Sequence, residues 1–128
     1  MRISGITLAL AMATAALGDA GTRSVAPTGL FSDLRYIEEA GDLIGMEVYL
    51  VQGRSGYSAI VQCAGGEPAD PVVVEAEVDG ATVSFELPKG QPECGTMFRG
   101  VVSAKGLRGR FVGESKDRWL PRKKGYWE

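Results

Sequence analysis

The sequence predicts an all-β fold: a single antiparallel meander of about seven or eight strands closed into a small barrel, with a two-sheet sandwich as the alternative. Beyond residue 20, short segments alternate apolar and polar residues, which is the pattern of a half-buried strand. The 18 glycines fall mostly between these segments, where short strands need tight turns. No stretch of this region repeats apolar residues with the period of a helix. A closed barrel is the economical arrangement because closure leaves no exposed edge strand.

The predicted strands follow one another along the chain. Residues 43–52 give the clearest pattern, because Met46, Val48 and Leu50 alternate with residues that suit a wet face. A glycine-bounded turn at 53–56 ends this strand. Further strands are expected at 34–38, 57–63, 72–78, 82–87, 97–103, 107–112 and 118–120.

The strongest hairpin signal is Asp79 followed by Gly80, which separates two alternating segments. Each of these strands places apolar side chains on one face and acids or hydroxyls on the other. In the later hairpin, the inward residues of 107–112 alternate with Arg108 and Arg110, so both arginines are expected to point outward. The inward set of the first hairpin is Val74, Ala76, Val78, Val83, Phe85 and Leu87.

Whether the interior of the barrel is open or filled distinguishes two kinds of function. About eight strands leave a space just wide enough to be filled by side chains or to hold one small ligand. An open, apolar-lined cup is typical of a ligand carrier, whereas a filled interior favours interaction through the surface. The side chains that would fill the interior are Met46, Val48, Leu50, Phe85 and Phe111.

The N-terminus has the pattern of an export signal. Arg2 supplies the positive charge, residues 6–17 form an apolar core, and small residues offer cleavage after Gly18 or Ala20. The apolar core is shorter than the roughly 20 residues that span a membrane, so no transmembrane segment is expected in the mature chain. We therefore expect a signal peptide at 1–20, a flexible leader at 21–32 and the barrel domain at 33–128, in a periplasmic or secreted protein.

The two cysteines are expected to form a disulfide. In an oxidising compartment an even pair predicts a bond, and two thiols without histidine cannot complete a zinc site. A bond between Cys63 and Cys94 closes a loop of about 30 residues, which stabilises the fold by roughly 3–4 kcal/mol in the chain-entropy model. The bond would fix the loops at one end of the barrel, where we would first look for a binding site.

Composition bears on several classes of function. The chain contains no histidine, so it lacks the commonest general base and metal ligand, and we expect no enzyme, metal or cofactor. A formal net charge of −2 argues against a general nucleic-acid binder. The expected partner is therefore an unknown small ligand or an envelope protein.

The C-terminal segment is the most suggestive candidate for binding. Between residues 108 and 128, seven basic residues stand against three acids, with aromatic residues interleaved. A basic patch with aromatics suits an anionic glycan, a lipid headgroup or an acidic partner protein. Alternatively, the tryptophans anchor the last strand and the lysines keep the chain end soluble. The candidate residues are Arg108, Arg110, Arg118, Trp119, Lys123, Lys124, Tyr126 and Trp127.

The turn after residue 52 supplies a second candidate, Arg54 and Tyr57. Exposed loops on a rigid scaffold are where binding residues tend to lie, although a glycine-bounded hairpin turn is the ordinary meaning of this segment.

Three stretches carry a resemblance: GMEVYLVQGRSGYSAIVQCAGGEP, VDGATVSFELP, and GLRGRFVG with LPRKKGYW. Over about residues 34–127 the chain resembles uncharacterised small exported proteins of Gram-negative bacteria, a group that implies no activity. In architecture, an eight-stranded meander with one disulfide is also similar to lipocalin-like barrels and periplasmic lysozyme-inhibitor barrels. The leading hypothesis is an exported, non-enzymatic binding barrel. The alternative is a protein inhibitor or envelope-associated interaction protein that acts through a loop.

Overall fold

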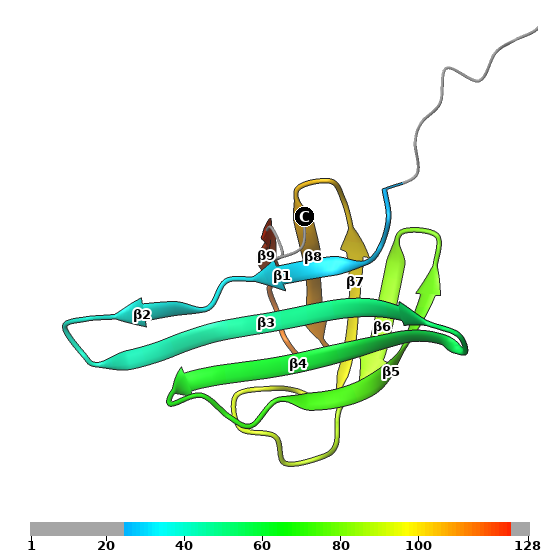
Figure 1. Cartoon of the computed structure of the whole chain (residues 1–128). Coiled ribbons are helices and arrows are strands. Elements are labelled where there is room, and N and C mark those ends of the chain that lie inside the picture. Colours follow the sequence, from blue (N-terminus) through cyan, green and yellow to red (C-terminus); the bar gives the residue numbers. More distant parts are fainter. Residues whose placement is uncertain (1–24, 124–128) are drawn as a thin grey trace, which may run out of the picture.

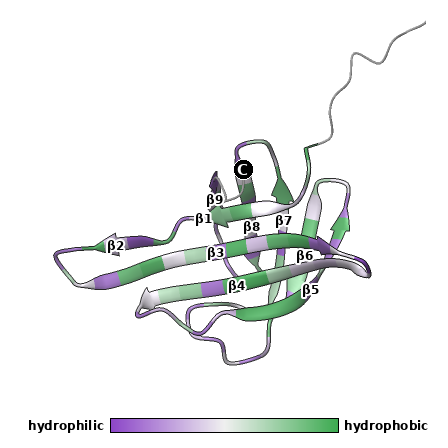
Figure 2. Cartoon of the chain, viewed as in Figure 1, coloured by the Kyte–Doolittle hydropathy of each residue, from purple (hydrophilic) through white to green (hydrophobic). Residues whose placement is uncertain are grey.

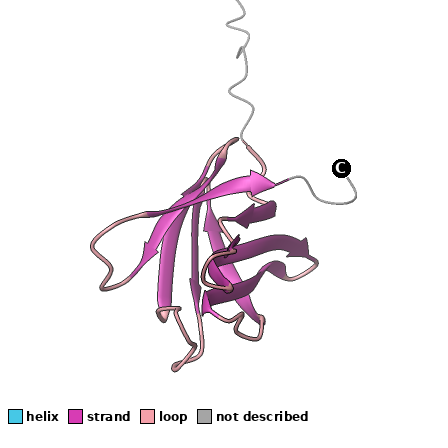
Figure 3. Cartoon of the chain, turned by 90° about the vertical axis from the view of Figure 1, so that its left-hand side faces the viewer, coloured by secondary structure: helices cyan, strands magenta, loops and turns pink. Residues whose placement is uncertain are grey.

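The computed structural model describes residues 25–123, and every regular element in this range is a strand (Figure 1). Figure 3 shows the same segments as strands and connecting loops. The all-β prediction is therefore confirmed. The strands are β1 (Gly29–Ser32), β2 (Arg35–Ile37), β3 (Asp42–Gly53), β4 (Gly56–Gly66), β5 (Val72–Asp79), β6 (Thr82–Glu86), β7 (Met97–Val102), β8 (Gly106–Phe111) and β9 (Arg118–Lys123).

The sheet closes into an antiparallel barrel. From β3 to β9 each strand pairs with the next, and β1 pairs with both β3 and β9 to complete a ring of eight strands. Phe31 is opposite Val48 on one side of this seam and opposite Arg122 on the other. The additional strand, β2, pairs with the first residues of β3 and extends beyond the barrel with it (Figure 1). The sheet is thus a barrel rather than the alternative sandwich.

The structure corrects the predicted leader. We expected residues 21–32 to precede the fold, but Gly29–Ser32 forms β1, and Phe31 is fully buried. The ring needs a strand between β3 and β9, and this segment supplies it. Gly29 has a φ of 139°, and a Cβ at this position would lie 2.7 Å from Arg122 Nη1, so glycine leaves room for that side chain.

Side chains fill the barrel interior. The five residues expected there are all 3% exposed or less. Phe85 stacks on Phe98 with 4.9 Å between ring centroids, and Phe98 meets Phe111 edge-on at 5.3 Å. Gly100 and Gly109 are opposite each other beside these rings, and a Cβ on Gly109 would lie 2.7 Å from Phe98 Cζ. In Figure 2, hydrophobic and hydrophilic residues are interspersed along the strands, as expected when one face packs inside the barrel and the other faces outward.

The connections alternate between the two ends of the barrel because the strands form a meander. The turn end carries the short turns at 54–55, 80–81 and 103–105. The disulfide end carries the longer loops at 67–71, 87–96 and 112–117, with Cys94 in the second of them. Residues 1–20 and the candidates Lys124, Tyr126 and Trp127 lie outside the described residues. Within residues 25–123, no helix has the length and apolar character needed to cross a membrane.

Candidate functional site

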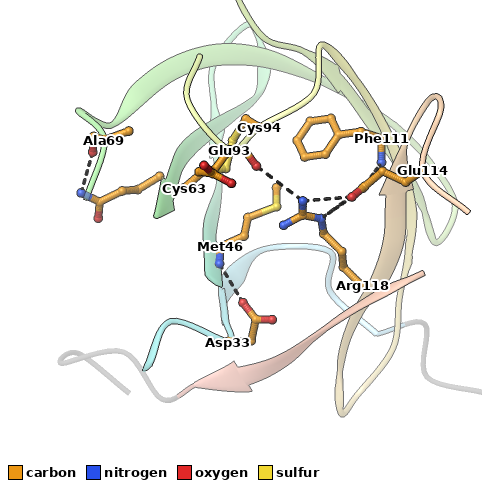
Figure 4. The surroundings of a disulfide bond; sticks show 10 residues. Asp33, Met46, Cys63, Ala69, Glu93, Cys94, Phe111, Glu114 and Arg118 are labelled. Atoms are coloured by element: carbon orange, nitrogen blue, oxygen red, sulfur yellow. Dashed lines mark hydrogen bonds and ion pairs between the residues drawn. A yellow bond between two sulfur atoms is a disulfide. The ribbon is translucent and has the colours of Figure 1, made fainter. Parts of the chain in front are cut away.

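The disulfide joins strand β4 to the loop between β6 and β7 (Figure 4). The Cα atoms of Cys63 and Cys94 are 5.9 Å apart, and the residues are 31 positions apart in the sequence. Cys63 is buried at the edge of the core, and Glu93 beside Cys94 takes a left-handed φ of 62°. The predicted bond is confirmed. It fastens the 87–96 loop at one end of the barrel.

At the same end, Arg118 is engaged within the fold (Figure 4). Its Nε donates to Glu114 Oε1 at 3.1 Å, and its Nη2 donates to Glu114 Oε2 at 3.0 Å. Nη2 also reaches the Glu93 carbonyl at 3.5 Å, and the guanidinium lies 5.5 Å from the Phe111 ring centroid. These contacts tie the 112–117 loop to β9 and to the disulfide loop. The pairing gives this candidate binding residue a structural role.

Glu114 is the one group in the described residues whose pKa is clearly shifted. Burial raises the pKa of its carboxyl, but hydrogen bonds from Arg118 and from the Phe111 N–H, with the charge of Arg118, outweigh burial. The net result is a pKa below the ordinary value of 4.5. Ionised Glu114 therefore stabilises the fold at neutral pH.

Replacing Glu114 with Gln tests this linkage. The stabilisation from Glu114 is complete above the unfolded-state pKa and is lost as the pH falls through the lower folded-state pKa. We expect E114Q to have a lower free energy of unfolding than the wild type at pH 7. The difference in free energy between the two proteins should narrow at pH values below 4.5. Urea unfolding at both pH values measures the gap. A gap that is the same at both pH values would contradict the assigned role.

Arg122, which was not among the candidate binding residues, has a structural role in the barrel. Its Nη1 donates to the Thr28 carbonyl at 2.8 Å, and its Nη2 donates to the carbonyls of Ala26 and Ser103 at 3.1 Å each. The guanidinium also lies 4.7 Å from the Phe31 ring centroid. The side chain thus connects the β1–β9 seam, the segment before β1 and the β7–β8 turn. No sequence pattern marks these partners, because they are backbone carbonyls distant in the sequence.

Three further arginines, Arg99, Arg108 and Arg110, form an exposed patch on the outer face of β7 and β8, beside Trp119 on β9. Arg99 on β7 is directly opposite Arg110 on β8, and both are exposed. Arg108, two residues before Arg110, is opposite Trp119, with its guanidinium 4.9 Å from the indole ring. We call this face the basic wall and define it by Met97, Arg99, Val101, Arg108, Arg110, Val112 and Trp119.

The basic wall is incompletely neutralised. Arg110 Nε lies 2.9 Å from Asp117 Oδ1. Within residues 25–123, no carboxylate lies within 4.0 Å of the guanidinium of Arg99 or Arg108. The sequence predicted Arg108, Arg110 and Trp119 for this site and missed Arg99. The same two-residue alternation that turns Arg108 outward could have found Arg99, which alternates with Met97 and Val101 on β7.

The second candidate lies elsewhere on the molecule. Arg54 is exposed at the tip of the β3–β4 turn, whereas Tyr57 is partly buried and packs against the core. Strand β4 is four strands away from β8 around the eight-stranded ring, so this turn and the basic wall are on opposite sides of the barrel. Lys123 is exposed at the end of β9, opposite Leu30.

The described part of the chain brings together no three cysteine, aspartate or glutamate residues that could hold a metal ion. Comparison with protein-family models finds no match, and searches among curated proteins and solved structures likewise find none.

Proposed function

We propose that this chain is an exported, non-enzymatic binding protein that meets its partner with the outside of the barrel. The observation that carries the proposal is the filled interior. Met46, Phe85 and Phe111 occupy the space in which a carrier would hold its ligand. The filled core therefore favours the interaction protein over the ligand carrier.

The sequence supports two parts of the proposal, namely export and the lack of a catalytic activity. The signal-like residues 1–20 and the disulfide are compatible with an oxidising compartment outside the cytoplasm. The absence of histidine removes the residue most used for acid–base catalysis. The basic wall is the strongest surface for such a role, because it gathers exposed cations without a full set of carboxylate partners.

Affinity capture from an envelope extract tests the proposal. We expect the folded, oxidised protein to retain an envelope component in comparable molar amount. The matched control is the same chain after reduction, alkylation and denaturation, which keeps the composition and charge but loses the folded surface. Equal retention by the control would contradict the proposal, as would retention of nothing. Recovery of a small apolar molecule from inside the barrel would favour the carrier instead.

A further inference from the structure

We propose that the basic wall docks on the surface of an anionic phospholipid bilayer. This inference rests on the proposed function, because it names the partner of the outer surface. It follows from three observations: the division of charge along the chain, the opposed arginines of β7 and β8, and the apolar residues exposed between them.

Charge is divided unequally between the two parts of the described chain. Residues 97–123, which form β7 to β9 and their connections, contain eight basic and two acidic residues. Residues 25–96 contain three basic and twelve acidic residues. The barrel is therefore strongly bipolar despite its small net charge. Such a molecule turns its basic side toward an anionic surface before contact.

The positive charges of the wall arginines repel one another. Like charges directly opposite each other on neighbouring strands destabilise a sheet, and Arg99 and Arg110 have this arrangement. Asp117 neutralises Arg110 only, and Arg108 adds a third guanidinium on the same face. Phosphate oxygens accept charge-assisted hydrogen bonds from guanidinium groups and would relieve this repulsion. The cluster is thus suited to an array of phosphates.

The apolar residues favour a bilayer over a soluble anion. Eight large hydrophobic side chains are exposed in the described residues, and four of them belong to the basic wall. Val112 is 79% exposed and Val101 is 53% exposed, and Trp119 lies beside Arg108. A dissolved polyanion needs cations alone, whereas the headgroup region of a bilayer accommodates cations, small apolar side chains and tryptophan together.

The shape of the wall suits a flat partner. The barrel wall is convex, so a flat surface laid against β8 comes nearest to the two neighbouring strands, β7 and β9, and stays away from the other strands. The acidic side chains of Glu75 and Glu77 are on β5, three strands away from β8 around the ring. Glu86 on β6 is opposite Met97, and Glu77 lines the same surface hollow as Arg99, so acidic side chains border the wall on its β7 side. A bilayer centred on β8 and β9 lies farther from these carboxylates than from the arginines of the wall.

Vesicle co-sedimentation of the full mature chain tests the inference. The probes are vesicles of phosphatidylglycerol and phosphatidylcholine in equal parts, and vesicles of phosphatidylcholine alone. We expect binding to the first kind only, weakened by added salt. Each arginine near an anionic surface contributes about fivefold in partitioning, so R99Q/R108Q is expected to bind about 25-fold more weakly. The matched control R35Q/K89Q removes the same charge from exposed sites outside the wall and should bind as the wild type does.

A second variant separates lipid docking from simple charge attraction. V101T/V112T keeps every charge and changes only exposed apolar groups of the wall. We expect it to bind more weakly than the wild type and to be released at lower salt, while its thermal unfolding midpoint stays unchanged.

Three results would overturn the inference: no binding to the anionic vesicles, equal loss of binding in R35Q/K89Q and R99Q/R108Q, or unchanged binding of V101T/V112T. Binding of soluble polyglutamate in place of vesicles would also overturn it and point to an acidic protein partner. Failure with vesicles leaves the proposed function standing, since capture of an envelope component tests that separately.

Discussion

Replacing both cysteines with alanine is expected to lower the free energy of unfolding by about 3–4 kcal/mol. The bond joins residues 31 positions apart, and closing a loop of this length removes much of the conformational freedom of the unfolded chain. It also holds the 87–96 loop against β4, where Cys63 is buried. This loss is a large share of the stability of a domain of this size. Urea unfolding of C63A/C94A against the wild type measures it.

Reduced wild-type protein is the matched control for the double variant. Under reducing conditions it should lose a similar free energy of unfolding, because the cross-link and not the cysteine side chains supplies the stabilisation. A loss below about 1 kcal/mol in both measurements would contradict the disulfide's role as a major constraint on the fold.

Replacing Arg122 with alanine is expected to destabilise the barrel by about 2–4 kcal/mol. A hydrogen bond to a charged group contributes about 1.5–3 kcal/mol, and Arg122 makes three such bonds, two of which are exposed and therefore count for less. The substitution also removes the stack on Phe31 at the seam where the ring closes. Arg122→Lys keeps the charge but not the fork of donors, so we expect an intermediate loss. Chemical denaturation measures both variants.

Lys123 provides the control for Arg122, because it is the next residue on β9 and its side chain is exposed. Lys123→Ala is expected to change stability by less than about 0.5 kcal/mol. Hydrogen exchange adds a local measure, since loss of Arg122 should increase exchange in β1 and β9 before the other strands. Equal stability of Arg122→Ala and Lys123→Ala would contradict the role assigned to Arg122.

Most of the fold could be predicted because its strands are long enough to show alternation. Along β3, Met46, Val48 and Leu50 point inward and are fully buried, as the pattern indicates. Strand β1 escaped prediction because it has only four residues, begins at Gly29 and lies just after Pro27, and both of these residues are typical of loops. Its strand character comes from pairing with β3 and β9, which are distant in the sequence.

The candidate site could be predicted only in part, because the sequence does not show which charges pair across the barrel. Arg118 and Arg122 look like Arg108 and Arg110 in the sequence, yet the first two are partly buried and held by several hydrogen bonds within the fold. Arg108 and Arg110 lie exposed on the outer face, where Arg110 has one ion pair, with Asp117. The partners of Arg118 and Arg122 depend on loop positions that alternation does not describe. The outward direction of Arg108 follows from alternation, whereas its neighbour Arg99 comes from another strand and depends on the register of β7 against β8.

The central claim is that the barrel is filled and meets its partner with its outer surface. Native mass spectrometry of the folded, oxidised protein purified from the cells that produce it tests this claim most directly. We expect the mass of the polypeptide with its disulfide and no bound small molecule, because Phe85, Phe98 and Phe111 occupy the interior. A stoichiometric apolar molecule that stays bound to the folded chain and is released on unfolding would contradict it.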